Sequence, residues 1–245
     1  MKKALPLLAL LCAPLVCAAN STDCHLRVGW EEWYPLIYQQ NEQLVGSEYS
    51  ELQALAHDAG YTLAFIEEPW ARALQKLKQG RLDLLYGASH SLEREAFARF
   101  SQPYRVEEMV LVIAGVPSAP PVANLSLRQW LNEPRADGRP RTLGVIRGFY
   151  YGEELEPIVR DPQATAQRLE VRWDQQLLDV LARGRIDGYL LEDSVARAMQ
   201  RESTQPLQSF GVSEHTEEPM HLMFSRAVPE SVVQRFNAAI ARRPR

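Results

Sequence analysis

The sequence contains few of the residues that build disulfides, zinc sites and nucleic-acid surfaces. Two of its three cysteines lie in the first 17 residues, so Cys24 has no partner for an internal disulfide once that segment is removed. The five histidines are scattered, and we expect no metal and no cofactor. Acidic residues outnumber basic ones by 31 to 27, without a basic run before the extreme C-terminus, so nucleic acid is not an expected partner.

Long apolar runs are missing after the first 20 residues. The chain begins MKKALPLLALLCAPLVCAAN, in which two lysines precede an apolar stretch that ends at the small-residue cleavage site CAA, residues 17–19. The stretch is too short for a comfortable membrane span. We therefore expect residues 1–19 to be a secretory signal peptide and the remainder to be a soluble exported protein.

Two segments of the remaining chain are similar in sequence. LQKLKQGRLDLLY (74–86) and LDVLARGRIDGYL (178–190) share the pattern Leu-x-x-Leu-x-x-Gly-Arg-(Leu/Ile)-Asp. In each, an amphipathic helix is predicted to end at a glycine, Gly80 or Gly184, which can adopt the left-handed conformation after a helix. An apolar strand then begins at once.

A second pair of similar segments supports a duplicated α/β organisation. LRVGW (26–30) and LGVIRG (143–148) both read as short buried strands, and each precedes a helix-strand-helix-strand series. The predicted helices are 48–59, 70–79, 152–160 and 174–183, and a final helix begins at Pro229. We expect a first lobe over 20–112, a second lobe over 113–214, and a crossover that returns to the first lobe over 215–245.

Arg94 is the first candidate for a ligand contact. Within SHSLEREAFARFSQPY (89–104), Ser91 is predicted to cap a helix whose first turn contains Arg94. This arginine opposes the helix dipole and has no acidic partner at helical spacing. It follows a strand end, where the helix N–H groups, the hydroxyl of Ser89 and the guanidinium fork suit a carboxylate. The alternative is a solvated surface arginine.

Five segments in this order resemble the periplasmic solute-binding proteins of the polar amino acid type, which serve ABC importers. They are LRVGWEEWYPL, PWARALQKLKQGRLDLLYGAS, SLEREAFARFSQPY, LGVIRGFYYGEE and GRIDGYLLEDSVA. The resemblance covers nearly the whole exported chain. It implies an α/β fold of the two-lobe, type II class, in which each lobe has a mixed, mainly parallel sheet flanked by helices and the ligand lies between the lobes.

The resemblance assigns one end of the cleft to the ligand's α-carboxylate. Arg94 matches the arginine that grips this group, and Ser89 matches a hydroxyl and amide donor to it. Gly148 matches the glycine whose following backbone closes on the carboxylate from the second lobe. Phe149 departs from the family pattern of Ser or Thr at this position. We expect its ring to line an unusually aromatic cleft, whose other aromatic residues are Tyr150, Tyr151, Trp30, Trp33, Tyr34, Trp70 and Tyr86.

The resemblance assigns the other end to the ligand's α-ammonium. Glu192 matches the acidic residue that binds this group, and Asp193 is the alternative. Trp70 and Tyr34 match two aromatic walls, and Glu31 lies where the family often has an acidic or polar contact. Such a cleft fits a zwitterion, and aromatic faces attract an ammonium. From the residues alone, Trp70 also fits a core position and Glu192 a solvated strand end.

The leading functional interpretation is a monomeric, non-enzymatic receptor in the periplasm that presents a small zwitterion to an inner-membrane ABC permease. A periplasmic enzyme similar to cyclohexadienyl dehydratase is an alternative on the same fold, with Glu192 as its general acid. A ligand-sensing module is a third. The chain stops at AAIARRPR, where the family usually continues into one more short helix, so we expect the first lobe to be capped differently.

Overall fold

The computed structural model describes residues 25–115, 124–215 and 217–243. The expected signal peptide, Cys24 and most of the Pro-rich loop that joins the two predicted lobes lie outside these residues. None of the helices in the described ranges has the length and apolar character needed to cross a membrane.

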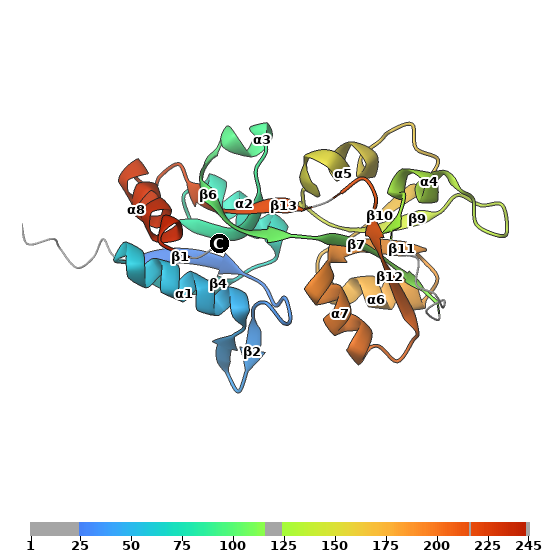
Figure 1. Cartoon of the computed structure of the whole chain (residues 1–245), viewed down its shortest axis with the longest axis horizontal. Helices are drawn as coiled ribbons and strands as arrows, with labels where there is room; N and C mark the ends of the chain where they lie inside the picture. The colour runs from blue at the N-terminus through green and yellow to red at the C-terminus, as the bar shows by residue number, and fades with distance from the viewer. Residues whose placement is uncertain (1–24, 116–123, 216, 244–245) are drawn as a thin grey trace, which may run out of the picture.

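The first lobe is built on a five-stranded sheet with the order β4-β1-β5-β13-β6 (Figure 1). β1 runs parallel to β4 and β5, whereas β13 is antiparallel to both β5 and β6. The strands are β1 (His25–Trp30), β4 (Thr62–Glu67), β5 (Leu84–Ser89), β6 (Ala98–Glu107) and β13 (Glu218–Ser225). The lobe also contains the hairpin β2 (Tyr38–Gln40) and β3 (Gln43–Val45), with α1 (Ser47–Ala59), α2 (Trp70–Lys78), α3 (Leu92–Glu95) and α8 (Glu230–Ala241).

The second lobe is built on a six-stranded sheet with the order β10-β9-β11-β7-β12-β8. β9 is parallel to β10 and β11, and β7 is antiparallel to β11 and β12. The strands are β7 (Met109–Ala114), β8 (Asn124–Leu125), β9 (Thr142–Ile146), β10 (Gln167–Val171), β11 (Gly188–Glu192) and β12 (Leu207–Val212). The helices are α4 (Leu127–Asn132), α5 (Gly152–Val159), α6 (Gln175–Ala182) and α7 (Asp193–Glu202). The predicted two-lobe α/β class, with mixed sheets, is confirmed.

Two crossover segments join the lobes, and Figure 1 shows β6, β7 and β13 running between them. The chain leaves the first sheet after Glu107 and enters the second at Met109. This is a few residues before the predicted boundary of 112/113, because the apolar run from Met109 pairs along its length with β11 and β12. The return, between β12 and β13, brings Glu218 opposite Glu107 in the first sheet.

The repeated Gly-Arg-x-Asp pattern has the same structural role in both lobes. Gly80 and Gly184 follow their helices with φ values of 69° and 63°, as predicted. Asp83 Oδ2 accepts a hydrogen bond of 2.8 Å from the backbone N–H of Arg27, and Asp187 Oδ2 accepts one of 2.8 Å from the backbone N–H of Thr142. Each aspartate therefore binds the neighbouring parallel strand near its start, away from the strand ends where ligands bind.

Candidate functional site

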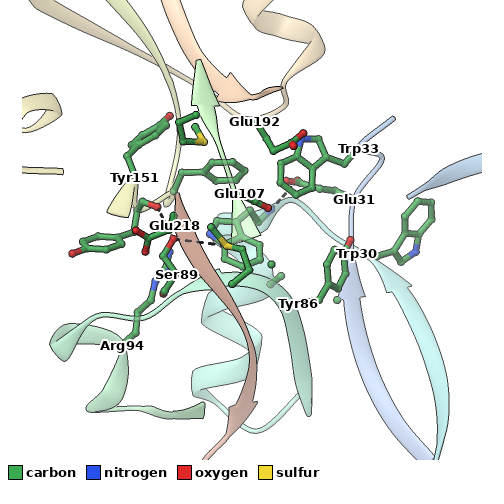
Figure 2. A pocket seen from close by; sticks show the side chains of 18 of the residues that line it. Trp30, Glu31, Trp33, Tyr86, Ser89, Arg94, Glu107, Tyr151, Glu192 and Glu218 are labelled. Atoms are coloured by element: carbon green, nitrogen blue, oxygen red, sulfur yellow. Dashed lines mark hydrogen bonds between the residues drawn. The ribbon is translucent and has the colours of Figure 1, made fainter. Parts of the chain in front are cut away.

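A pocket of about 730 Å³, including its part open to solvent, lies between the lobes. Its walls come from the ends of β1, β5 and β11, the loop between β9 and α5, and both crossovers. Figure 2 shows Arg94, Ser89 and Glu218 on one side of this pocket, and Glu31, Glu192 and Trp33 on the other. The site thus lies beyond the carboxyl ends of parallel strands, where α/β sheets bind ligands.

Arg94 is buried in the pocket wall and is only 6% exposed. Ser91 caps α3 as predicted, accepting the Arg94 backbone N–H at 3.3 Å. The Arg94 guanidinium donates to Ser89 O at 2.8 Å and to Gly148 O at 3.3 Å, and it makes no ion pair with a described residue. Burial lowers the pKa of Arg94 to about 10, so the side chain keeps its charge at neutral pH.

Gly148 brings the second lobe into contact with the first. Its carbonyl accepts the guanidinium of Arg94 and also the indole N–H of Trp70, at 3.0 Å. Its φ is +81°, and a Cβ here would lie 3.2 Å from the Cα of Ala71. Glycine is therefore needed both for the left-handed conformation and for the close approach of the lobes.

Three aromatic rings occupy the middle of the pocket. Phe149, from the second lobe, packs edge-on against Trp70 at 5.8 Å and against Trp33 at 6.4 Å between ring centroids. Trp33 packs against the buried clusters of both lobes, and its indole nitrogen is buried without a hydrogen-bond partner among the described residues. These contacts place Phe149 between two tryptophans of the opposite lobe.

Tyr34, the predicted second aromatic wall, is not among the residues that line this pocket. Its ring packs against Tyr38 at 4.7 Å between centroids. Trp33 lines the pocket instead. The backbone here turns, with Ile37 N–H donating to Trp33 O at 3.0 Å, and does not continue the alternation of a strand. We therefore propose that Trp33, and not Tyr34, forms the second aromatic wall for the ligand.

Glu31 and Glu192 both line the pocket and both bind helix N-termini. Glu31 Oε2 accepts the backbone N–H of Trp70 at 2.9 Å, at the start of α2. Glu192 Oε2 accepts Val195 N–H at 2.9 Å and the Ser194 hydroxyl at 2.6 Å, at the start of α7. Asp193, the alternative to Glu192, lies outside the pocket lining and pairs with Arg197 at 2.7 Å.

Burial changes the titration of two carboxyl groups in the pocket wall. Burial raises the pKa of Glu31 to about 8, and the Trp70 N–H bond only partly opposes this. Burial also raises the pKa of Glu107 to about 7. The positive charge of Arg105 opposes this rise, and the negative charge of Glu192 adds to it. The resulting environment favours a ligand that brings positive charge.

Sequence reasoning did not predict Glu107 and Glu218 as site residues, and it expected Trp33 only as part of the aromatic cleft, with the wall contact given to Tyr34. The two glutamates belong to the crossovers, in VEEMVLV (106–112) and TEEPMHLMF (216–224). Each acidic pair directly precedes an apolar strand, which is the signal that could have identified them. Tyr86, Tyr150 and Tyr151 also line the pocket and extend its aromatic wall.

A model of the bacterial extracellular solute-binding proteins, family 3, matches residues 26–243. The chain belongs to this family. The match includes both lobes and both crossovers described above. No curated protein sequence matches the chain significantly.

Solved structures share the fold of this family 3 solute-binding protein at low identity. An ancestral arginine-binding protein bound to arginine aligns with a TM-score of 0.71 and 19% identity, covering 89% of this chain and 91% of its own. The substrate-binding protein of an amino acid ABC transporter aligns with a TM-score of 0.70 and 18% identity, covering 89% and 92%. An amino acid ABC transporter substrate-binding protein from Streptococcus pneumoniae, bound to L-arginine, aligns with a TM-score of 0.69 and 17% identity, covering 89% and 88%.

Proposed function

We propose that this protein is a receptor that closes its two lobes around a small amine-bearing solute, an α-amino acid or a related amine, and presents it to an inner-membrane ABC permease. Family membership supports solute binding, and the site supports the class of solute. Export to the periplasm and a monomeric state belong to the same proposal.

The observation that supports an amine is the charge of the pocket wall. Five glutamates line the pocket against a single arginine, Arg94; they are Glu31, Glu68, Glu107, Glu192 and Glu218. Glu68 pairs with Arg72 and Lys76, and Glu107 pairs with Arg105. The other three make no ion pair with a described residue. A cationic ligand would therefore meet carboxyl groups that have no cationic partner, and it would favour their ionised form.

The aromatic part of the wall supports the same class. The faces of tryptophan, tyrosine and phenylalanine attract an ammonium or guanidinium group within about 6 Å, most strongly where water is excluded. Trp33, Trp70 and Phe149 surround the middle of the pocket, between its two polar ends. The solved structures with arginine bound, named above, are consistent with a cationic solute.

We favour a receptor over an enzyme on this fold. Glu192, the residue proposed as general acid in the alternative, binds the start of α7 through two hydrogen bonds, a role that requires no proton transfer. The described residues also include no cluster of three or more His, Cys, Asp or Glu side chains that could hold a metal. The choice between transport and sensing depends on partners outside this chain.

A thermal-shift screen tests the proposal. The purified protein is heated with amino acids, amines and small carboxylates, each at a fixed concentration. A ligand at 100 times its dissociation constant stabilises the folded state by about 2.7 kcal/mol, which is a clear rise in Tm. We expect amine-bearing compounds to raise Tm and carboxylates without an amine to have no effect. Stabilisation by carboxylates alone would contradict the proposal.

A further inference from the structure

Glu218 places a carboxylate of the chain itself at the end of the pocket where Arg94 lies. It is the first residue of β13, on the returning crossover, and Figure 2 shows it beside Ser89 on the Arg94 side. Its carboxylate lies near the Ser89 hydroxyl. The same carboxylate lies directly against Gly152, so that a Cβ at this glycine would overlap Oε2. Glu218 therefore reaches from Ser89 of the first lobe to the start of α5 in the second.

Glu218 lies on the side of the pocket where the carboxylate of an amino acid is expected, without an ion pair to Arg94. The expected donors were the fork of Arg94, the hydroxyl of Ser89 and the backbone that follows Gly148. In the structure, Arg94 donates to two carbonyl oxygens of the chain, Ser89 O and Gly148 O. The Ser89 hydroxyl has long contacts with neutral acceptors, Tyr150 O at 3.4 Å and Met220 Sδ at 4.0 Å.

The charges around this end of the pocket also disfavour a second anion. Arg94 lies within the field of Glu93, Glu156 and Glu218. Burial raises the pKa of Glu218, and the nearby charges of Glu154 and Glu153 raise it further. A ligand carboxylate would enter a region in which several carboxylates already surround one guanidinium, and juxtaposed like charges oppose binding.

The opposite end of the pocket lacks this conflict. Glu31 and Glu192 face the pocket there without a cationic partner among the described residues, and Trp33 provides an aromatic face. A ligand with an ammonium at this end and an uncharged body between the aromatic rings suits the whole pocket. Its positive charge lies near Glu31 and Glu192, and it places no negative charge near Glu218.

We propose that Glu218 replaces the ligand's own carboxylate, and that the protein binds small organic amines in preference to the corresponding α-amino acids. This inference rests on the proposed function, because it narrows the class of solute for the same pocket. Glu218 then determines specificity, by rejecting the carboxylate that distinguishes an amino acid from its amine.

Matched pairs of ligands test the inference on the unmodified protein. Each pair consists of an amino acid and the amine that remains after loss of the carboxylate: lysine and cadaverine, arginine and agmatine, tyrosine and tyramine, phenylalanine and phenethylamine. Calorimetry at one pH and ionic strength gives both affinities. In the pair that binds best, we expect the amine to bind at least about tenfold more tightly than the amino acid.

The Glu218→Gln variant identifies the residue responsible. It retains the length and shape of the side chain but removes the charge. We expect the preference for the amine to shrink by about tenfold or to reverse. Glu217→Gln is the matched control, because Glu217 is exposed on the same crossover and does not line the pocket. It is expected to leave the preference unchanged.

The outcomes separate this inference from the proposed function. If the unmodified protein binds an amino acid as tightly as its amine, or if Glu218→Gln leaves the preference unchanged, Glu218 is not the determinant and the inference is overturned, while an amine receptor stands. If no member of any pair binds, the proposed function is overturned together with the inference.

Discussion

Arg94 donates a hydrogen bond of 3.3 Å across the cleft to the carbonyl of Gly148. The same carbonyl accepts the indole N–H of Trp70 at 3.0 Å, so that two donors of the first lobe bind one acceptor of the second. These are the residues that family resemblance associates with the ligand itself. The structure therefore shows them holding the lobes together, which links closure directly to the binding site.

Arg94→Ala is expected to weaken binding of every amine ligand by roughly 10- to 150-fold. The variant loses a hydrogen bond from a charged group, which contributes about 1.5–3 kcal/mol, and with it one of the two bonds to Gly148. Calorimetry on a matched amine and amino acid measures the loss. Equal losses for both identify a role in closure, whereas a loss confined to the amino acid would show that Arg94 grips a carboxylate. Exposed Arg201→Ala serves as the control.

Gly148→Ala is expected to impair closure. The added Cβ lies 3.2 Å from the Cα of Ala71 in the other lobe, in addition to the strain of a positive φ. Gly184→Ala is a matched control, because Gly184 also has a positive φ but has no atom within 4 Å of a built Cβ. Both changes carry the backbone cost of about 1–2 kcal/mol. Only Gly148→Ala should lose the ligand-induced decrease in radius of gyration, measured by small-angle scattering. Equal behaviour of the two variants would argue against this contact in the closed form.

The positions at strand ends could be predicted from sequence, because their signals are local. A helix stop at glycine, an apolar strand and a capping serine identify the ends of β5, β9 and β11, and with them Ser89, Gly148 and Glu192. The choice between Trp33 and Tyr34 could not be made this way, since the two lie in a turn without strand alternation. Glu107 and Glu218 meet only through the antiparallel pairing of β6 with β13. Such long-range pairing is not visible in either segment alone.

Glu31 is expected to make both stability and binding depend on pH. Burial raises the pKa of Glu31 from an ordinary 4.5 to about 8, so between these values the folded state binds more protons than the unfolded chain. The stability of the ligand-free protein should therefore fall as pH rises from about 5 to 8. Glu31→Gln should flatten this slope in thermal unfolding while retaining an acceptor for the Trp70 N–H, and exposed Glu67→Gln should not. An unchanged slope in Glu31→Gln would contradict the assignment.

The same carboxyl group predicts proton release on binding. A bound cation lowers the pKa of nearby carboxyl groups because it stabilises their charged form. Near pH 7, Glu31 and Glu107, whose pKa values are raised to about 8 and about 7, should lose protons when an amine binds. Calorimetry in buffers of different ionisation enthalpy measures the number released. Affinity should then increase from pH 6 to pH 8, and proton uptake instead of release would contradict a cationic ligand.

Glu192→Gln separates a receptor from an enzyme. The amide retains an oxygen for the Val195 N–H at the start of α7, so we expect the fold to persist. In a receptor, loss of the charge weakens amine binding, with little effect on ligands that lack the amine, and neither protein alters its ligand. In an enzyme, the variant still binds substrate but loses turnover.

Asp193→Asn is the matched control for this test, because Asp193 lies outside the pocket lining and pairs with Arg197. It removes an adjacent carboxylate at the same helix start, so any general effect on α7 appears in both variants. We expect weaker amine binding in Glu192→Gln alone. Prephenate, arogenate and the amines of the binding assays are incubated with each protein and followed by mass spectrometry. We expect no product, since Glu192 is already committed to hydrogen bonds with Val195 and Ser194. Repeated turnover by the unmodified protein that disappears only in Glu192→Gln would establish the enzyme in place of the receptor.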